Sequence, residues 1–338
     1  MSDTAHIVIL DGYTINPGDN PWTEIEGLGT CTIYDRTPPE LVVERAGNAE
    51  IILTSKVKLS EATLAALPKL RYISMLATGY NNVDVAAAGR LGIPVANIPA
   101  YSPESVVQTT FALLLELTVA VGIHDAAVKA GEWTRSPDHS FWKQSIPELD
   151  GMTLGIVGYG TIGRAVARVG AAFGMKIVSY MPRIPQDAGP VPVRFVPLEE
   201  LFAVADVVTL NCPQTPENTG FVDARLIGLM KPGAYLINVA RGGLVNEGDL
   251  AAALAAGRIA GAGLDVVSHE PMTPDNPLLT APRCVITPHI AWASLAARNR
   301  LMKILAANIA SYLAGAPINL VNGSTLAGAR TGIGQQNR

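Results

Sequence analysis

The sequence has few cysteines, and their spacing excludes two classes of protein. Three occur in 338 residues, and Cys31, Cys212 and Cys284 lie far apart. An odd number at such distances forms neither a disulfide framework nor a metal-ligand spacing. We therefore predict three reduced cysteines, no bound metal and a cytoplasmic location.

Clusters of like charge are also missing. The 25 lysines and arginines against 29 acidic residues leave a formal net charge of −4, and no basic run stands out. Nucleic-acid grooves and membrane-surface patches need clustered basic side chains, so we expect neither kind of partner. A few separate arginines are enough for a small anionic ligand.

An uninterrupted apolar run is lacking as well. The longest apolar stretch, residues 106–123, has polar members, which argues for a buried or subunit-facing helix and against a membrane span. These polar members are Gln108, Thr109, Thr110 and Glu116. The first four residues, Met1-Ser2-Asp3-Thr4, show neither the basic flank nor the apolar segment of a signal peptide.

The composition that is present favours an α/β fold. Apolar residues make up 49% of the chain and charged residues only 16%, which suits buried parallel strands and excludes a disordered chain. In the first part, short apolar runs alternate with helical stretches, which predicts a parallel sheet with right-handed crossovers. The expected strands are residues 6–10, 50–53, 72–75 and 94–96, and the expected helices are residues 40–46, 61–67 and 85–91.

The same alternation returns more strongly after residue 153 and predicts a second, larger doubly wound unit. Its expected strands are residues 153–157, 176–180, 207–210, 235–239, 261–266 and 284–287, and its helices include residues 162–173 and 247–256. Between the two units, Ser102 followed by Pro103 is typical of a helix start. A further helix is expected at residues 294–313, followed by a mobile tail at residues 323–338.

An irregular stretch at residues 131–150 follows the helix that begins near Pro103. It contains Trp133, Phe141 and Trp142. Aromatic side chains on a long loop indicate either a lid or an arm that reaches another subunit.

A dinucleotide fingerprint follows the strand at residues 153–157. It reads Gly158-Tyr159-Gly160-Thr161-Ile162-Gly163 and leads into a helix. In this context Gly158 permits the tight turn, Gly160 lets the backbone approach a pyrophosphate, and Gly163 permits close packing of helix on strand. Backbone N–H groups and the helix dipole then stabilise the phosphates.

The end of the next strand bears on the choice of cofactor. NAD enzymes usually place Asp or Glu there to bind the ribose 2′-hydroxyl. Here Tyr180 is followed by Met181, Pro182 and Arg183, with no acid. Arg183 offers a planar fork for a 2′-phosphate, or else is simply solvated, so we expect NADP(H) and keep NAD(H) as the alternative.

Three later segments leave the carboxyl ends of expected strands, where open α/β sheets bind their ligands. They are Asn238-Val239-Ala240-Arg241-Gly242-Gly243, the run from Gly263 to Pro271 that contains Asp265 and Glu270, and Thr287-Pro288-His289-Ile290-Ala291-Trp292. Together with the fingerprint, these segments resemble the D-isomer-specific 2-hydroxyacid dehydrogenases, with the nearest match in the glycerate dehydrogenase and hydroxypyruvate or glyoxylate reductase branch. The resemblance extends to about Asn322.

The resemblance implies a domain plan in which a Rossmann cofactor domain is inserted into a smaller, flavodoxin-like substrate domain. Residues 1–101 and 291–322 would form the substrate-binding domain, and residues 102–290 the NAD(P)-binding domain. The loop at residues 76–84 resembles the loop of this family that binds the substrate carboxylate, through backbone amides at Thr78 and Gly79.

The resemblance also implies the catalytic roles. Hydride transfer to the keto carbon of a 2-oxo acid leaves charge on its oxygen, and His289 would protonate that oxygen. Glu270 would hydrogen-bond the other ring nitrogen and favour the protonated ring, although His269 is a rival partner. Arg241 would bind the substrate carboxylate and polarise the carbonyl.

Further cofactor contacts are implied in the same way. Asp265, with the backbone near Val239 and Ala240, would meet the nicotinamide carboxamide, and Cys212 and Pro213 would line the adenosine side. Each of the proposed site residues has a structural alternative, such as a hydrogen-bonded core histidine for His289 or a domain-bridging ion pair for Arg241. The remaining histidines, His6, His124, His139 and His269, are interpreted as structural or solvated.

Two functions from different classes fit these motifs. The first is an enzyme that reduces a small 2-oxo acid reversibly to the D-2-hydroxy acid, with hydroxypyruvate expected first and glyoxylate second. The second is a nucleotide-sensing protein of corepressor type on the same fold. By resemblance we also expect a homodimer formed through a helix at residues 105–123.

Overall fold

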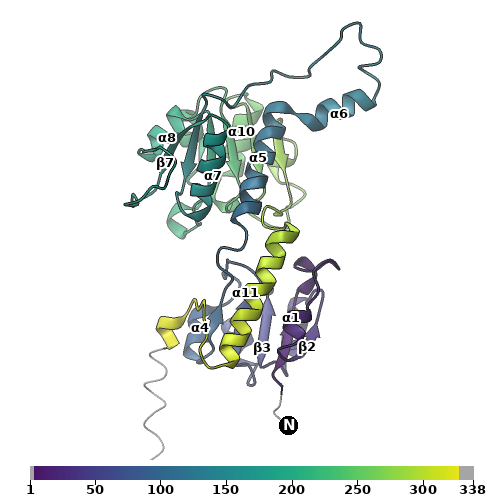
Figure 1. Cartoon of the computed structure of the whole chain (residues 1–338), viewed down its shortest axis with the longest axis vertical. Helices are drawn as coiled ribbons and strands as arrows, with labels where there is room; N and C mark the ends of the chain where they lie inside the picture. Colours follow the sequence, from purple (N-terminus) through teal and green to yellow (C-terminus); the bar gives the residue numbers. More distant parts are fainter. Residues whose placement is uncertain (1–3, 327–338) are drawn as a thin grey trace, which may run out of the picture. The chain divides into compact units, whose positions relative to one another are not determined.

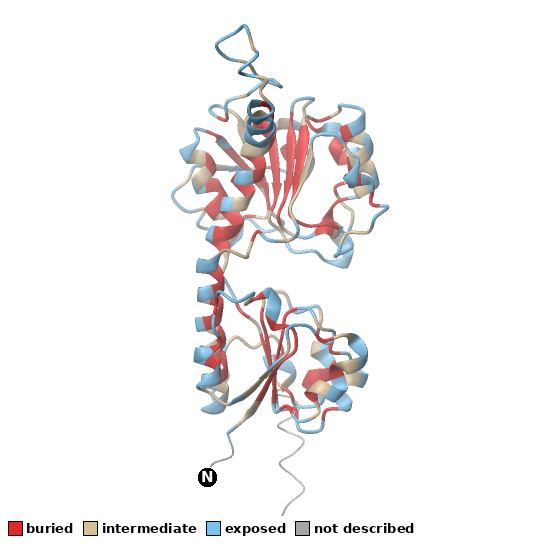
Figure 2. Cartoon of the chain, turned by 90° about the vertical axis from the view of Figure 1, so that its right-hand side faces the viewer, coloured by how far each residue is buried: buried red, intermediate tan, exposed pale blue. Residues whose placement is uncertain are grey.

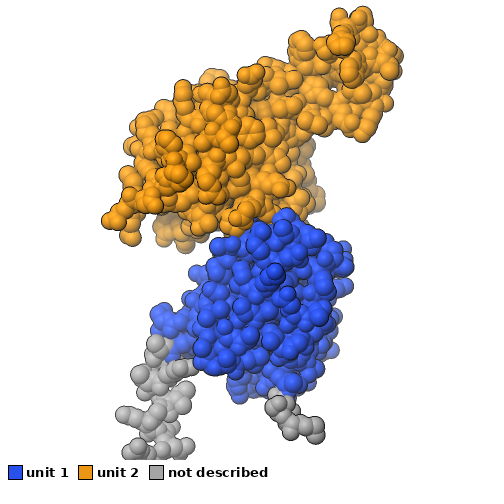
Figure 3. Space-filling model, in the orientation of Figure 1, with its two compact units in different colours: residues 1–102, 293–338 blue, residues 103–292 orange. Residues whose placement is uncertain are grey.

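The computed structural model describes residues 4–326, and the chain divides into two compact units, which Figure 3 shows in two colours. Unit 1 comprises residues 1–102 and 293–338, and unit 2 comprises residues 103–292. The chain therefore leaves unit 1 once and returns to it after unit 2 is complete. Both units consist of a parallel sheet with helices packed against it.

Unit 1 is built on a five-stranded sheet with the order β2-β1-β3-β4-β5, in which all strand pairs are parallel. This is the doubly wound order of flavodoxin-like folds. Its strands are β1 (His6–Ile9), β2 (Thr30–Ile33), β3 (Ile51–Thr54), β4 (Tyr72–Met75) and β5 (Val95–Ala96). Its helices are α1 (Thr23–Glu26), α2 (Val42–Ala46), α3 (Glu61–Ala65), α4 (Val85–Arg90) and α11 (Leu295–Leu313), with short 3-10 turns η1 (Gly12–Thr14) and η2 (Pro39–Leu41) (Figure 1).

Side chains fix where the helices of unit 1 begin. The Ser60 hydroxyl accepts the Thr63 N–H at 3.3 Å before α3, and Asp84 accepts the Ala87 N–H at 2.9 Å before α4. Such caps satisfy donors that the first helical turn leaves without an intrahelical partner. The strands β3 and β4 between these helices are buried throughout, as parallel strands covered on both faces should be.

Asn322 fastens the returning segment of the chain to the edge strand of unit 1. It is 2% exposed, accepts the Val95 N–H and donates to the Ile93 carbonyl, both at 2.9 Å. Of the tail predicted at residues 323–338, residues 323–326 form a helical turn. Residues 327–338 lie outside the described part of the chain.

Unit 2 is built on a seven-stranded parallel sheet with the order β12-β11-β10-β9-β6-β7-β8. The order reverses at β6, as in the dinucleotide-binding Rossmann fold. Its strands are β6 (Thr153–Val157), β7 (Lys176–Tyr180), β8 (Val193–Phe195), β9 (Val207–Leu210), β10 (Tyr235–Asn238), β11 (Gly261–Leu264) and β12 (Cys284–Ile286). Its helices are α5 (Pro103–Val119), α6 (Val121–Lys129), α7 (Thr161–Ala172), α8 (Leu198–Val204), α9 (Ala224–Leu229) and α10 (Glu247–Ala255), with 3-10 turns η3 (Pro216–Asn218), η4 (Gly242–Leu244) and η5 (Pro277–Leu279).

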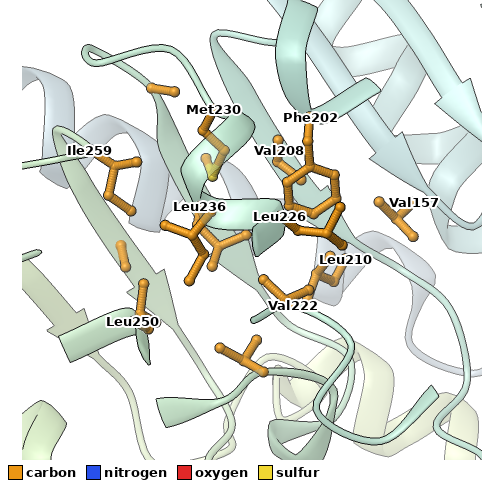
Figure 4. Close-up of a cluster of buried hydrophobic side chains, with 14 of the residues drawn as sticks. Val157, Phe202, Val208, Leu210, Val222, Leu226, Met230, Leu236, Leu250 and Ile259 are labelled. Carbon is orange, nitrogen blue, oxygen red and sulfur yellow. The ribbon is translucent and has the colours of Figure 1, made fainter. Parts of the chain in front are cut away.

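The sheet of unit 2 is buried between two apolar clusters. One lies against α8, α9 and α10 and is centred on residues such as Phe202, Leu226 and Leu236, which Figure 4 shows together. The other lies against α5 and α7 and includes Phe111 and Val166. In Figure 2 the central strands are correspondingly red, while the outer faces of the helices are blue. Burial of both sheet faces holds the carboxyl ends of the strands in fixed positions.

The helix expected at residues 105–123 is interrupted, which corrects the prediction. Ala120 adopts a left-handed conformation with φ 53° and ψ 50°, and α6 starts at the next residue. The Glu116 carboxylate accepts the Gly122 N–H at 3.3 Å, so it satisfies a donor of the first turn of α6. Because α5 and α6 differ in direction by 54°, the apolar stretch forms two helices.

Within residues 4–326, no single helix is long and apolar enough to cross a membrane. Only α5 and α6 taken together reach the necessary length and composition, and they are bent at their junction.

Candidate active site

The three glycines of the fingerprint have different surroundings at the start of α7. Gly158 has φ +96°, and a Cβ there would lie 2.8 Å from the backbone of Asn211 and of Cys212. A Cβ on Gly163 would lie 2.1 Å from the Gly158 carbonyl oxygen. A Cβ on Gly160 would meet no atom within 4 Å. Gly158 and Gly163 are therefore required for close packing, whereas Gly160 borders open space.

The N-terminus of α7 fits a dinucleotide pyrophosphate. Gly160 is its N-cap and supplies no side-chain cap, so the first N–H groups are not blocked by a side chain of the cap residue. Thr161 is exposed and Ile162 is half-buried at this end. Unblocked N–H groups and the positive end of a helix dipole, next to a glycine in open space, form a site for phosphate.

The residues predicted to line the adenosine side of this site follow the ends of β7 and β9. Arg183 is exposed three residues after β7, and no acid occurs between Tyr180 and Arg183. After β9, Cys212 is half-buried, and burial raises the pKa of its thiol. Pro213 follows, and its carbonyl accepts a hydrogen bond from the Asn218 side chain at 2.9 Å.

His289 and Glu270 form a hydrogen-bonded pair beyond the ends of β12 and β11. His289 Nδ1 donates to Glu270 Oε2 at 2.6 Å, and the two side chains are 27% and 31% exposed. His269 is exposed and its Nδ1 lies 3.0 Å from the Pro271 carbonyl oxygen. Glu270 thus binds His289 and not the neighbouring His269, and Nε2 of His289 has no hydrogen-bond partner within residues 4–326.

The backbone of His289 is held in a left-handed conformation. Its φ is 55°, and its N–H donates to the Asp265 carbonyl at 2.8 Å. The indole N–H of Trp292 donates to the His289 carbonyl at 2.9 Å. A non-glycine residue in this region costs free energy and persists only where neighbours enforce it, and these two bonds hold the backbone that carries the imidazole.

The Asp265 carboxylate holds the same loop. It is 1% exposed and accepts the Thr287 hydroxyl at 2.5 Å, the Ile290 N–H at 2.9 Å and the Ala291 N–H at 2.8 Å. Both of its oxygens are therefore engaged in shaping the turn around His289. The contact between Asp265 and a nicotinamide carboxamide stays a prediction.

Arg241 lies on the loop after β10. It is exposed, and its Nη1 donates to the Ala240 carbonyl at 2.7 Å. Asn238, which is 1% exposed, donates to the Arg241 carbonyl at 2.9 Å and accepts the Ala240 N–H at 3.0 Å. Asn238 therefore shapes the backbone that presents the guanidinium, while Val239, predicted to line the cofactor site, is 8% exposed.

Thr78 and Gly79 lie in unit 1, on the loop that follows β4. The Thr78 hydroxyl donates to the Ile98 carbonyl at 2.7 Å, and the Thr78 carbonyl accepts from the Asn97 side chain at 2.8 Å. The loop thus has a defined conformation within its own unit. The predicted role of these two residues in substrate binding is not tested by these contacts.

Sequence reasoning missed several residues that orient this site. They are Asn238, Gly242, Thr287 and Trp292. Each lies within the three motifs but acts through a hydrogen bond or a backbone contact, for which one sequence carries no signal. Among residues 4–326, no group of three His, Cys, Asp or Glu side chains could hold a metal ion.

Comparison with known proteins places these observations in a family. The sequence model described as "D-isomer specific 2-hydroxyacid dehydrogenase, NAD binding domain" matches residues 111–291. A hydroxypyruvate reductase from Blautia hydrogenotrophica is 46% identical over 325 residues, which cover 94% of this chain and 99% of the relative. A glycerate dehydrogenase from Methylorubrum extorquens is 40% identical over 291 residues, or 85% of this chain and 90% of the relative.

Solved structures show the same architecture. An NADPH-dependent glyoxylate/hydroxypyruvate reductase from Sinorhizobium meliloti, solved with NADP and malonate, is 28% identical with a TM-score of 0.80, and the match covers 94% of this chain and 97% of that one. The sequence motifs, the two parallel sheets and the relatives all indicate the same family. The chain therefore belongs to the D-isomer specific 2-hydroxyacid dehydrogenase family, in its glycerate dehydrogenase and hydroxypyruvate reductase branch.

Proposed function

We propose that this chain reduces hydroxypyruvate, and glyoxylate less well, to the D-2-hydroxy acid, with NADPH as the preferred cofactor. The observation that carries the proposal is the 2.6 Å hydrogen bond from His289 to Glu270. Arg241 lies on the loop after β10, the strand next to β11 in the sheet. Relatives named for hydroxypyruvate, glycerate and glyoxylate support the substrate class. Nothing in the comparisons favours the corepressor alternative.

The chemistry follows from three side chains. A reduced nicotinamide, when bound, supplies the hydride to the keto carbon. Arg241 binds the substrate carboxylate through its planar fork and polarises the carbonyl. His289 gives the proton on Nε2 to the carbonyl oxygen as charge develops there. Glu270 accepts from Nδ1, which fixes the ring orientation and stabilises the imidazolium before the proton leaves.

The nicotinamide cofactor follows from the family, whereas the preference for NADPH is the proposal. Its support is the absence of an acid after β7 and the exposed Arg183. A 2′-phosphate gains a bidentate, charge-assisted partner from arginine. A ribose 2′-hydroxyl would lack the carboxylate that NAD enzymes use.

Substrate size and oligomeric state belong to the same proposal. Thr78 and Gly79 would bind the substrate carboxylate through their amides. The arm at residues 131–150 would limit the size of the substrate and, with α6, contribute to a homodimer. Support comes from exposed apolar side chains on both segments, Val121 and Ile123 on α6 and Trp133 and Trp142 on the arm, since such patches mark interfaces. A monomer in light scattering would refute the dimer.

The first experiment is absorbance-monitored oxidation of NADPH and of NADH with hydroxypyruvate, glyoxylate and pyruvate. We expect NADPH with hydroxypyruvate to be fastest, and His289→Ala to lower kcat by a factor on the order of 10²–10⁴. His269→Gln, which changes an exposed neighbouring histidine, should retain the wild-type rate. Unchanged turnover in His289→Ala, or pyruvate used ten times better than hydroxypyruvate, would contradict the proposal.

A further inference from the structure

The second residue of the fingerprint, Tyr159, reaches the loop that carries Arg183. Tyr159 is 2% exposed, and its ring packs edge-on against Phe195 with centroids 5.4 Å apart. Its hydroxyl donates to the Ala188 carbonyl at 3.1 Å. Burial raises the pKa of the phenol, although Arg164 and Arg168 lower it, so the group remains a neutral donor.

Arg164, in the first turns of α7, reaches the same loop. Its Nη2 donates to the Asp187 carbonyl at 2.6 Å, and its guanidinium lies 5.1 Å from the centre of the Tyr159 ring. The Asp187 carboxylate in turn accepts the Gly189 N–H at 2.7 Å. Two side chains from the fingerprint helix and turn therefore bind adjacent carbonyls of one loop.

The near end of this loop is also tied to the fingerprint. The Gly158 N–H donates to the Tyr180 carbonyl at 2.8 Å, at the end of β7. Residues 181–186 lie between this bond and the contacts at Asp187 and Ala188. They include Pro182 and Pro185, which lie on either side of Arg183. Proline fixes its own φ and restricts the residue before it, so Pro182 and Pro185 limit the backbone conformations of the segments on both sides of Arg183.

Arg183 itself is exposed, and within residues 4–326 its guanidinium has no hydrogen bond or ion pair, although both ends of its loop are held. An exposed charge without a protein partner is accessible to a ligand, and a backbone that is already held lowers the conformational entropy lost on binding.

We propose that Tyr159 and Arg164 are positioning residues for cofactor selection, and that their bonds to Ala188 and Asp187 hold Arg183 where it meets the 2′-phosphate of NADPH. The inference rests on the proposed preference for NADPH. Neither residue need touch the 2′-phosphate. The fingerprint turn thus contributes to the choice between the two cofactors as well as to pyrophosphate binding.

The test measures binding of two cofactor fragments to the protein without substrate. Titration calorimetry compares 2′,5′-ADP, which has the 2′-phosphate, with 5′-AMP, which lacks it. Loss of one hydrogen bond corresponds to about a fivefold change in affinity. We expect Tyr159→Phe and Arg164→Gln each to weaken 2′,5′-ADP about fivefold and to leave 5′-AMP nearly unchanged. Hydrogen–deuterium exchange in residues 181–192 should rise in both variants.

Two further variants separate the possible outcomes. Arg168→Gln removes the same charge from an exposed position one turn further along α7, and should change neither binding nor exchange. Arg183→Gln should weaken 2′,5′-ADP by at least as much as the loop variants but leave exchange unaltered.

If Arg183→Gln has no effect, or the wild type binds the two fragments equally, the proposed NADPH preference fails and this inference with it. The inference alone is overturned if Arg183→Gln weakens binding of 2′,5′-ADP but Tyr159→Phe and Arg164→Gln do not. It is also overturned if Tyr159→Phe and Arg164→Gln weaken binding of 2′,5′-ADP and of 5′-AMP equally.

Discussion

Gly242 and Val267 are in backbone contact, with no room for a side chain between them. A Cβ on Gly242 would lie 1.8 Å from the Val267 carbonyl carbon and 2.0 Å from its oxygen. Gly242 follows Arg241 on the loop after β10, and Val267 precedes Glu270 on the loop after β11. The groups proposed to bind the substrate carboxylate and to orient the imidazole are therefore fixed relative to each other through the main chain.

Gly242→Ala should damage stability and catalysis together. The added methyl meets backbone atoms, which cannot move aside as a flexible side chain can. We expect the free energy of unfolding of unit 2 to fall by more than about 2 kcal/mol, and kcat/KM for hydroxypyruvate to fall at least tenfold. Urea unfolding and steady-state kinetics measure the two effects.

Gly228→Ala is the matched control, since a Cβ there would meet nothing within 4 Å and Gly228 lies in helix α9. Alanine in a helix is favoured over glycine, so this variant should be as stable as the wild type or slightly more so. Wild-type kinetics in Gly242→Ala would show that the two loops move independently.

The central strands of both sheets were predictable from the sequence, because parallel strands buried on both faces are short apolar runs. The ranges predicted for β4, β6, β7 and β9 agree with the structure. The strands β2 and β8 were missed. Both are edge strands and are only partly buried, so polar residues interrupt the pattern. The break at Ala120 was missed because alanine carries no signal for a left-handed conformation.

The site was predictable as far as residue types determine chemistry. Chemistry and family resemblance together pointed to His289, Glu270 and Arg241, and the structure brings His289 and Glu270 into contact. The part of Asp265 in holding the His289 loop was not predictable. Its three hydrogen bonds join residues 22 to 26 positions away along the chain, and no local pattern records such contacts.

Glu270→Gln should slow reduction. Glutamine keeps an acceptor near Nδ1 but removes the negative charge that pairs with the imidazolium in the proposed mechanism. We expect kcat to fall about tenfold in steady-state kinetics with hydroxypyruvate. Glu217→Gln, an exposed acid on η3, serves as the control. Wild-type turnover in Glu270→Gln would mean that Glu270 only orients the ring.

The three cysteines should be unreactive in the folded protein. Burial raises the pKa of Cys284 to about 12, and it also raises the pKa of Cys212. Burial, with a smaller contribution from the charge of Glu26, raises the pKa of Cys31 to about 11. Because the thiolate is the nucleophile, alkylation of Cys31 by iodoacetamide at pH 8 should be about a hundredfold slower than that of a free thiol. Mass spectrometry should find all three labelled after unfolding in urea. Rapid labelling of Cys212 with loss of activity would contradict this prediction.

An ion pair in unit 1 should make its stability depend on acid pH. Arg298, which is 7% exposed, donates to both oxygens of the Asp19 carboxylate at 2.5 and 2.6 Å. Hydrogen bonding by Arg298 lowers the pKa of Asp19 below its ordinary value. A lowered carboxyl pKa adds stability above the pKa of the unfolded chain, near pH 4, and this stability is lost as the pH falls through the folded value.

Asp19→Asn should therefore be less stable than the wild type at pH 6, and the two proteins should converge as the pH falls below about 4. Trp22, three residues after Asp19, is buried in unit 1 and reports urea unfolding of that unit when Trp133, Trp142 and Trp292 are replaced by Phe. In the same background, Glu24→Gln alters an exposed acid on α1 and should follow the wild type throughout. A constant difference between Asp19→Asn and the wild type from pH 6 to pH 2.5 would show that the carboxylate contributes through packing and not through its charge. In that case the protonated carboxyl of Asp19 would bind Arg298 as strongly as the carboxylate does, and the contact with Arg298 could not be the cause of a lowered Asp19 pKa.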